Sequence, residues 1–410
     1  MQPLKITLLG NYYDCQLYRG RLYLWTFDGD LCIYDWNQII DTIIGRGEDW
    51  LTYRYGYKDG RYLYGSKTKQ LFEDEEFKQI VMRRYDQTLG RKCVITEEEI
   101  IECLIGKQQA TLPIDTEIYN STLYYATDKG LFCATAHRPM SEKYKVSTKP
   151  RKLWDARVLN ITANDYPQIA VSAGSEGLYE FRPSAQNLET VLQEIKPQLY
   201  KVSERFSLFS NYVYESIYSS SLNGKSYVSM FRFDRDSQES YHRVFDKYLD
   251  EKEFTSGAMK EKEVLSWGIR DKVYQVSEKK LRVLRFDKWR EYGQDNRLIE
   301  LAEMDMDMRS RLIRGGAASF GNVLEFEDYI LVLQSDDTQY VIPGEATRWR
   351  VYPRSINYVN QLHVIQDDRV EFYSFNHDSQ VDQQAKMNGI EYYVPTSKGA
   401  GRMYEEEMRG

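Results

Sequence analysis

The sequence contains few of the residues that hold metal ions or form disulfide frameworks. Only five of its 410 residues are cysteine and four are histidine. The cysteines are odd in number and form no CxxC pair, and the histidines are too far apart for a metal-binding spacing. We therefore expect no metal site, no cofactor and a reducing, cytoplasmic location. The residues concerned are Cys15, Cys32, Cys93, Cys103, Cys133, His137, His242, His363 and His377.

Long apolar runs and basic segments are also missing. No stretch approaches the ~20 apolar residues of a membrane helix. The apolar part of the opening MQPLKITLLG is too short for a signal peptide. The net charge is -7, and no segment is dense in lysine and arginine. Because nucleic acid binding needs a basic face, we expect neither a nucleic acid nor a membrane as a partner.

Tyrosine is the residue present in excess. The chain has 34 tyrosines but only 10 prolines, and 42% of its residues are hydrophobic. Tyrosine favours strands, because its ring packs on a sheet while its hydroxyl stays in water. The composition therefore predicts β structure with many partly covered faces, or a tyrosine-rich binding surface.

One pattern recurs along the chain: an aromatic residue, a short gap, an apolar strand, a polar turn and a second alternating strand. The stretch STLYYATDKGLFCAT, Ser121–Thr135, contains both strands and the turn. Most copies start about 45–60 residues after the previous one, close to the ~40–50 residues of a four-stranded propeller blade. The first interval is about twice as long, which predicts an insertion or a hidden copy. The seven copies start at Tyr18, Tyr119, Tyr166, Tyr214, Trp267, Phe326 and Tyr358.

Burial explains why such a unit repeats. A four-stranded antiparallel sheet cannot bury both of its faces alone, but radially stacked blades cover one another. The runs LYLW, IAV and YILVL suit middle strands that are buried on both faces. The turns DG, DKG, GSEG and NG contain residues that tolerate positive φ. We therefore predict an all-β fold, a seven-bladed β-propeller with a small α-helical insertion; six or eight blades are the alternatives.

Two of these stretches resemble a known type of blade. YYATDKGLFCAT and IAVSAGSEGLYEFRP resemble the blade signature of two-component-regulator-type propellers, and GDLCIYDW looks like the end of a third strand in WD40 propellers. The chain departs from WD40 in lacking the Gly-His element, and no copy holds a full sialidase box. The resemblance implies the fold and does not imply an activity.

A segment from about Ser66 to Ala110 breaks the repeat. The sequence LFEDEEFKQIVMRRYDQ predicts a helix, because its apolar residues recur at helical spacing, with acids first and arginines last. Thr96 and Glu99 form a capping-box pattern that predicts a second helix. We expect this insertion to pack on the propeller edge or to form a docking surface for another protein, and its deletion to leave the propeller folded. The candidate contact residues in the first helix are Phe77, Ile80, Val81 and Tyr85.

These patterns predict an organisation for the whole chain. Residues 1–65 form the first propeller part, 66–110 the helical insertion, 111–376 the remaining blades, and 377–410 a closing strand and flexible tail. We expect LKITLL near the N-terminus, GIEYYVP near the C-terminus, or both, to complete the ring. The charged run Arg235–Phe254 is predicted to be a long connection between blades.

Acidic residues recur in the turns of the repeat. Aspartate is common in turns because its side chain bonds the local backbone. If the turns share one face, however, they form an acidic rim that would select a basic peptide or loop. Both interpretations stay open, and a cation site is a weaker third. The acids are Asp28, Asp30, Asp128, Glu176, Glu278, Asp336, Asp337, Asp367 and Asp368.

The sequence predicts a binding protein better than an enzyme. No GxSxG, HExxH, P-loop or GxGxxG motif occurs. We therefore predict no catalytic residues and a scaffold or regulatory subunit that binds a partner protein in a hetero-complex. The partner would contact the propeller-face loops and the helical insertion, possible contacts being the turn acids and the helix residues named above. The alternative is a propeller hydrolase or lyase that uses carboxylates near the central channel.

Overall fold

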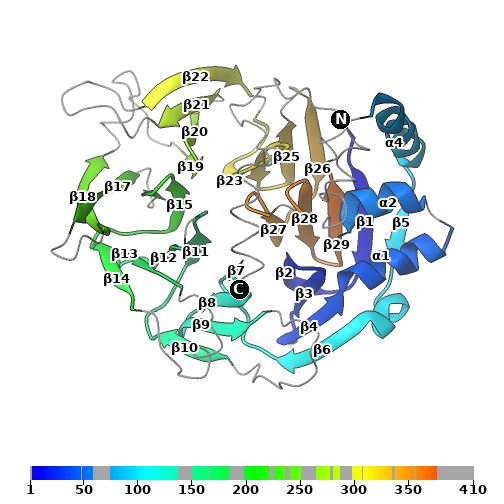
Figure 1. Cartoon of the computed structure of the whole chain (residues 1–410), viewed down its shortest axis with the longest axis horizontal. Helices are drawn as coiled ribbons and strands as arrows, with labels where there is room; N and C mark the ends of the chain where they lie inside the picture. The colour runs from blue at the N-terminus through cyan, green and yellow to red at the C-terminus, as the bar shows by residue number, and fades with distance from the viewer. Residues whose placement is uncertain are drawn as a thin grey trace. The chain divides into compact units, whose positions relative to one another are not determined.

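The structure is a computed structural model of the whole chain. It describes residues 2–47, 49–58, 74–136, 150–165, 167–183, 198–220, 226–235, 241–250, 265–277, 280–286, 298–306, 308–334, 338–355 and 357–375. Strands dominate, and they form seven separate sheets. The chain has the fold of a seven-bladed β-propeller, as the sequence predicted (Figure 1).

The chain divides into two compact units, and one of them is built from both ends of the sequence. Unit 1 spans Met1–Leu112 and Met308–Glu391. It contains three sheets, which we number as blades 1, 6 and 7 in the order of the repeat copies. Blade 1 consists of β2 (Tyr12–Tyr18), β3 (Arg21–Thr26), β4 (Asp30–Asp35) and β6 (Leu104–Gln109). Blade 6 consists of β23 (Leu312–Ala318), β24 (Gly321–Phe326), β25 (Tyr329–Gln334) and β26 (Gln339–Pro343). Blade 7 consists of β27 (Arg348–Val351), β28 (Gln361–Gln366), β29 (Arg369–Ser374), β1 (Leu4–Leu9) and β5 (Cys93–Ile95).

Unit 2 spans mainly Pro113–Asp307 and contains four sheets, blades 2 to 5. Blade 2 consists of β7 (Asp115–Tyr119), β8 (Thr122–Thr127), β9 (Gly130–Thr135) and β10 (Arg151–Trp154). Blade 3 consists of β11 (Asn160–Ala163), β12 (Ile169–Ser172), β13 (Leu178–Phe181) and β14 (Tyr200–Ser203). Blade 4 consists of β15 (Phe209–Val213), β16 (Ser216–Ser220), β17 (Tyr227–Arg235) and β18 (Tyr241–Asp250). Blade 5 consists of β19 (Leu265–Ile269), β20 (Lys272–Ser277), β21 (Lys280–Phe286) and β22 (Leu298–Asp305).

The middle strands are buried from end to end. Every residue of β8, β12, β20, β25 and β28 is buried. Within each unit, neighbouring blades contact one another through their first strands, such as β7 with β11 and β2 with β27. The near-continuous apolar runs in the sequence therefore mark strands that are covered on both faces. Each of the seven repeat copies corresponds to one blade.

The tight turns between first and second strands use left-handed backbone. Arg19, Asn120, Ser121, Tyr214 and Arg270 all have φ values between +45° and +61°. Two-residue hairpins need positive φ because only then does the turn follow the right-handed twist of the strands.

The N-terminal strand completes blade 7. β1 pairs antiparallel with β29 along its whole length, from Leu4 opposite Ser374 to Leu9 opposite Arg369. The first and last parts of the sequence therefore share one sheet, as predicted for LKITLL, and this arrangement removes a free edge from the third strand of the blade. The other candidate closing segment, GIEYYVP, lies outside the described residues.

In its described residues, the long interval between β4 and β6 of blade 1 contains helices and the short strand β5 but no further four-stranded sheet. The helices are α1 (Trp36–Gly45), α2 (Trp50–Tyr57), α4 (Glu75–Thr88) and the 3-10 helix η2 (Glu98–Cys103). The helices therefore begin well before Ser66, where the sequence predicted the insertion to start. The predicted second helix is a short 3-10 helix followed by strand β6, so Leu104 and Ile105 lie in a strand.

Two further expectations are corrected by the strand assignments. Arg235–Phe254 is not a simple connection between blades, because Tyr241–Asp250 forms β18, the fourth strand of blade 4. The described part of the segment 66–110 also takes part in the sheets and the core of unit 1. It contains β5 and β6, and its Tyr85, Ile95 and Ile100 belong to the hydrophobic core of unit 1. Its deletion would remove the outer strands of two blades together with part of that core.

Two glycines at the start of third strands provide a test of the blade packing. Gly130 and Gly177 have φ values of +135° and +102°. A Cβ on Gly130 would lie 2.0 Å from the Trp154 carbonyl oxygen, and a Cβ on Gly177 would lie 2.0 Å from the Ser203 carbonyl oxygen. Trp154 and Ser203 are the last residues of the fourth strands of blades 2 and 3. We expect Gly130→Ala and Gly177→Ala each to lower the free energy of unfolding by about 2–4 kcal/mol, since backbone strain adds to the clash. Chemical denaturation measures this loss.

Gly47 is the matched control. Its φ is +86°, but a Cβ there would meet no atom within 4 Å. Gly47→Ala should therefore show only the strain of left-handed backbone, about 1–2 kcal/mol. Equal losses in all three variants would mean that the fourth strand does not approach the glycines closely.

Candidate functional site

The helical insertion is fixed to blade 7 by hydrogen bonds to the end of α2. The Gly56 carbonyl oxygen accepts hydrogen bonds from Ser374 Oγ at 2.9 Å, Asn360 Nδ2 at 3.2 Å and Gln361 Nε2 at 3.3 Å. The Tyr57 hydroxyl donates to the Phe372 carbonyl at 2.9 Å. The last carbonyls of a helix lack intrahelical partners, so blade 7 supplies them here.

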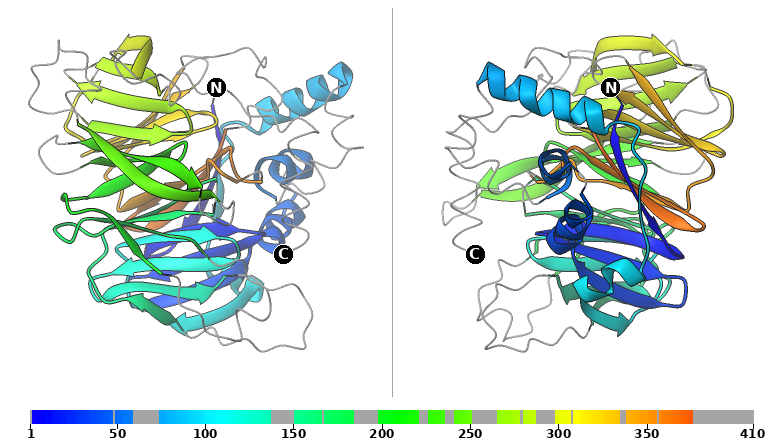
Figure 2. Two further views of the ribbon diagram at one scale, coloured as in Figure 1. Left: turned by 60° about the vertical axis from the view of Figure 1, so that its left-hand side comes forward. Right: turned by 90° about the vertical axis from the view of Figure 1, so that its right-hand side faces the viewer.

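Helix α1 brings a second anchor to the same place. Asp35 caps this helix by accepting a hydrogen bond from the Gln38 backbone N–H at 2.9 Å. The Trp36 indole then donates to the Tyr57 carbonyl at 2.7 Å, and its ring lies 4.8 Å from that of Phe372. Figure 2 shows α1, α2 and α4 together beside β1 and β5 of the same unit.

Helix α4 is held by two of the residues that the sequence proposed as partner contacts. Val81 and Tyr85 are buried. The Tyr85 hydroxyl donates to the Ser374 carbonyl at 3.0 Å and accepts a hydrogen bond from the Leu4 backbone N–H at 3.3 Å. In this conformation Val81 and Tyr85 therefore support the helix instead of presenting it to a partner. Phe77 is half-buried, and Ile80 is 44% exposed.

Large apolar side chains remain exposed around these helices. Trp50, the first residue of α2, is 58% exposed. Together with Ile80 it forms what we call the helix pair, since α2 contacts α4 and Asp49 lies beside Arg84 at 3.8 Å. A second group, which we call the rim patch, consists of Val94, Ile101 and Ile105, which are 38%, 53% and 49% exposed. Neither Trp50 nor Val94 stands out in the sequence, because single apolar residues outside a periodic pattern carry no signal of exposure.

A threonine hydroxyl binds the backbone in the acidic turns of blades 1 and 2. The Thr127 hydroxyl accepts from the Lys129 backbone N–H and donates to the Gly130 carbonyl, both at 3.0 Å. In blade 1, the Thr26 hydroxyl accepts from the Asp30 backbone N–H at 3.2 Å. Threonine therefore makes the local bonds that the sequence analysis assigned to aspartate. The exposed carboxylates of Asp28 and Asp128 make no hydrogen bond or ion pair within the described part of the chain.

The other turn acids lie in different surroundings. Glu176 is exposed between β12 and β13, and Asp367 is exposed between β28 and β29. Asp30 pairs with Lys107 at 2.9 Å, and Asp368 pairs with Arg369 at 2.8 Å. Asp28, Asp367 and Asp368 lie in connections between second and third strands in unit 1, Asp30 begins the third strand of blade 1, and Asp128 and Glu176 lie in the corresponding connections of unit 2.

The copy that starts at Phe326 is displaced by one strand. Asp336 and Asp337 fall between β25 and β26, the third and fourth strands of blade 6. Successive antiparallel strands turn at opposite ends of a sheet. The connection between β25 and β26 is therefore at the other end of blade 6 from the connection between its second and third strands, and a shared face stays a prediction for Asp336 and Asp337. Asp336, Asp337 and Glu278 themselves lie outside the described residues.

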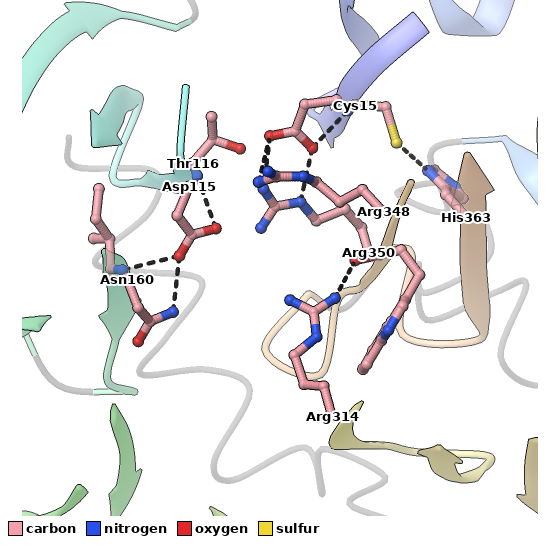
Figure 3. A network of polar contacts seen from close by, with 11 residues as sticks. Cys15, Asp115, Thr116, Asn160, Arg314, Arg348, Arg350 and His363 are labelled. Carbon is pink, nitrogen blue, oxygen red and sulfur yellow. Dashed lines mark hydrogen bonds and ion pairs between the residues drawn. The ribbon is translucent and has the colours of Figure 1, made fainter. Parts of the chain in front are cut away.

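The first strands of unit 1 contain a buried ion pair. Asp14 of β2 is fully buried, and Arg350 of β27 approaches it with two nitrogens, at 2.6 and 3.0 Å (Figure 3). Arg348 lies 3.5 Å from the same carboxylate, which also accepts the Cys15 backbone N–H at 2.8 Å. A bidentate guanidinium with an additional amide donor is the geometry that compensates a buried carboxylate for lost water.

The equivalent contact in unit 2 uses an amide instead of a guanidinium. Asp115 of β7 accepts hydrogen bonds from the Asn160 side chain at 2.8 Å and from the Ile161 backbone N–H at 2.9 Å (Figure 3). Asn160 Oδ1 in turn accepts from the Ser210 backbone N–H at 2.9 Å. One chain of hydrogen bonds therefore joins the first strands of blades 2, 3 and 4.

His363 is buried on β28 within the core of unit 1. Its Nε2 donates to Gln361 Oε1 at 3.0 Å, and its Nδ1 accepts from the Tyr352 hydroxyl at 3.0 Å, with Cys15 Sγ at 3.8 Å. Burial lowers the pKa of His363 to about 3 and raises the pKa of Cys15. Both groups are therefore neutral near pH 7, and neither is activated for acid–base or nucleophilic work.

The low pKa of His363 predicts acid sensitivity. Unfolded histidine has a pKa near 6.5, so the unfolded chain binds a proton that the folded chain excludes between about pH 6.5 and pH 3. Stability should fall as pH drops through this window, by up to ~1.4 kcal/mol per pH unit from this residue. Chemical denaturation between pH 7 and pH 4.5 measures the slope.

His363→Gln is the comparison variant. We expect it to be less stable than the natural chain at pH 7, because it disturbs a packed site, but to lose less stability on acidification. An unchanged slope in this variant would show that His363 is not the group that takes up the proton.

No helix in the described parts of the chain is long and apolar enough to span a membrane. In the same parts, no group of three or more His, Cys, Asp or Glu residues is placed to hold a metal ion. All five cysteines are buried and free.

Comparison with known proteins gives a likeness in fold. No family model matches the sequence, and no curated protein matches it. The β-propeller domain of Cps50 (Swd1) from Myceliophteria thermophila is 9% identical, with 89% of this chain and 96% of that chain covered and a TM-score of 0.45. BBS1N in complex with ARL6DN is 8% identical, with coverage of 93% and 100% and a TM-score of 0.46. BamB from Moraxella catarrhalis is 11% identical, with coverage of 90% and 82% and a TM-score of 0.39.

Proposed function

We propose that this protein is a binding scaffold or regulatory subunit that holds a partner protein in a hetero-complex. The observation that carries the proposal is the set of exposed apolar side chains on and beside the helical insertion, above all Trp50 and Ile80. The carbonyl end of α2 is bonded by blade 7, and this contact supports the insertion as a preorganised platform. A preorganised platform with an exposed tryptophan has the features of an interaction hot spot, because little conformational entropy is lost on binding.

The buried carboxylates favour binding over the rival function, a hydrolase or lyase. In the described part of the chain the buried acids are Asp14, Asp115, Glu180 and Glu371. Each is engaged by structural partners: Glu180, for example, accepts from the Tyr212 hydroxyl at 2.8 Å and pairs with Arg243. An acid held by fixed donors is a poor general acid or base. The enzyme alternative would need carboxylates that converge with open access to a substrate.

The helix pair gives the first test. Replacing Trp50 and Ile80 by alanine should weaken binding of the partner at least tenfold, since buried aromatic anchors contribute most of the energy of an interface. The partner is identified by capture with the full chain from an extract of its own cells, followed by mass spectrometry. Its Kd is then measured by titration with the purified protein.

Tyr200→Ala and Leu301→Ala are the matched controls, because these side chains are similarly exposed but lie on unit 2. They should leave the Kd unchanged, and thermal melts should confirm that all variants fold. If the helix-pair variant captures the same partner with the same Kd, the insertion is not the contact surface. If no partner is captured by the natural chain, the scaffold function itself is wrong.

The acidic turns give the second test, of a partner that contacts the protein through a basic segment. Asp128→Lys with Glu176→Lys should weaken binding and reduce its dependence on salt, since attraction between exposed charges is screened by ions. Thermal stability should change by less than about 0.5 kcal/mol, because both side chains are exposed.

Glu300→Lys, on an exposed position of β22, controls for the change in net charge. Titrations at two salt concentrations separate the electrostatic contribution from the rest. If the turn variant and this control weaken binding equally, the effect is one of overall charge, and the turns are not the site.

A further inference from the structure

The outermost strands of five blades are interrupted by a β-bulge. A strand edge presents N–H and C=O groups that can pair with another chain, and proteins block such edges with bulges, charged side chains or a covering strand. In these five blades the pairing register shifts, and the outermost strand contains one extra residue at the shift. The strands are β6, β10, β14, β18 and β22, and their extra residues are Ile105, Leu153, Val202, Asp246 and Leu301.

The same five strands also carry charged residues. Examples are Lys107 on β6, Lys201 on β14 and Glu300 on β22. Blade 7 is protected in a different way, because β5 adds a fifth strand beside β1. Arg46 donates to the Val94 carbonyl of β5 at 3.2 Å, so an arginine side chain already binds the backbone of this last strand.

Strand β26, the outermost strand of blade 6 (Figure 1), has none of these devices. Its pairing with β25 runs from Pro343, opposite Tyr329, to Gln339, opposite Leu333, without a register shift. Its sequence QYVIP contains no charged residue. Its length does not explain the difference, because β26 has five residues whereas β10 and β14 have four and still contain a bulge. In the described part of the chain, no strand pairs with the other edge of β26.

The hydrogen bonds at the two ends of β26 show which of its backbone groups point away from β25. The Gln334 N–H donates to the Thr338 carbonyl, and the Gly344 N–H donates to the Asp328 carbonyl, both at 2.9 Å. In an antiparallel pair every second residue exchanges hydrogen bonds with the neighbouring strand. Since Thr338 and Gly344 face β25, the even-numbered residues between them also face it, and the odd-numbered residues point outward.

The open part of this edge therefore consists of the N–H and C=O groups of Gln339 and Val341. Pro343, the next outward residue, has no N–H, and its carbonyl accepts a hydrogen bond from the Gln366 side chain at 2.9 Å, so the edge ends there. The Val341 side chain beside the open groups is 49% exposed. Two donors and two acceptors at alternate residues match the backbone of another extended chain.

The small size of this edge favours a partner segment over a second copy of the chain. Pairing along two outward residues buries much less than the ~1,600 Å² of a standard stable interface, so the edge alone would not hold a dimer together. It is sufficient for a segment of a protein that is also bound elsewhere, because the second contact is then intramolecular. Since β26 is uncharged and presents Val341, the complementary segment is uncharged and apolar at the opposite position.

We propose that β26 accepts an extended segment of the partner protein as a fifth strand of blade 6, in the way that β1 of blade 7 accepts β5. The backbone of the segment pairs with Gln339 and Val341, and an apolar side chain of the segment contacts Val341. This inference rests on the scaffold function proposed above and adds a second contact to it.

The test uses peptides selected on the full-length protein from a random library displayed on phage. We expect β-branched and aromatic residues to be enriched, since these favour strands. Val341→Pro should weaken binding of a synthetic copy of an enriched peptide at least tenfold, because proline removes an N–H from the edge. The thermal midpoint of this variant should be nearly unchanged, because an outward N–H makes no bond to β25 and proline is tolerated on such an edge.

Two control variants make the test specific. Val341→Thr keeps the N–H and the β-branched side chain, so it should keep the natural Kd. Leu301→Pro places proline at the bulge of β22, where the exposed side chain is similar to that of Val341, and it should also leave the Kd unchanged.

N-methylation of the peptide gives a readout that a folding role of Val341 would not change. An added strand uses only every second N–H for pairing with β26. Methyl groups on alternate residues should therefore abolish binding, and methyl groups on the residues between them should have little effect.

Several results would overturn the proposal. These are a selection that enriches no peptide, equal binding of the peptides to the natural chain and to Val341→Pro, a clearly lower thermal midpoint in that variant, or an effect of N-methylation that does not alternate. A dimer of the natural chain in sedimentation that Val341→Pro dissociates would assign the edge to a second copy instead. If Val341→Pro binds the cellular partner with unchanged Kd, this edge is wrong and the scaffold function stands; if the natural chain captures no partner, the scaffold function fails and this inference fails with it.

Discussion

The constraint on which this structure depends is that both faces of each sheet must be covered. The middle strands β8, β20, β25 and β28 contain no exposed residue, as expected for strands that are covered on both faces. Covering the faces also buries polar groups on the first strands, where water cannot reach them. The contacts of Asp14 with Arg350 and of Asp115 with Asn160 satisfy these groups between blades. These bonds are directional, so they also restrict how neighbouring blades are aligned.

The outer strands need less covering than the middle strands, and the features that differ from blade to blade are found there. β6 contains no buried residue, and β5 is a three-residue strand that pairs parallel with β1. Between these two strands and β4 the chain inserts its helices, and their buried residues Trp36, Tyr57 and Tyr85 extend the core of unit 1. The insertion therefore contributes to the core of unit 1 and also presents exposed apolar side chains such as Trp50 and Ile80.

The repeat and the number of blades could be predicted from the sequence, because strands that are buried on both faces leave an apolar run in each copy. Seven copies correspond to seven blades, and LKITLL closes blade 7 as predicted. Where the signal depends on distant residues, the prediction failed. The strand β18 is charged because it is an outer strand, so its sequence is typical of a loop. The sequence analysis did not predict helix α1, although Trp36, Ile39, Ile40 and Ile43 have the spacing of one buried helical face. The stretch GDLCIYDW, which ends at Trp36, has the pattern of a strand and hid the start of the helix.

The candidate site shows the same division between local and distant causes. The capping-box bond from the Thr96 backbone N–H to Glu99 forms at 2.8 Å, yet the helix ends after six residues because β6 must pair with β4. Helical spacing grouped Phe77, Ile80, Val81 and Tyr85, but only Val81 and Tyr85 are buried, because spacing alone does not distinguish residues that pack on the protein from residues that stay exposed.

Exposure is a property of the assembled blades, so the rim patch was beyond the reach of sequence patterns. The buried acids that could have supported chemistry are occupied in holding blades together. The features that the fold leaves unexplained therefore lie on an outer surface, where a second molecule has access to them.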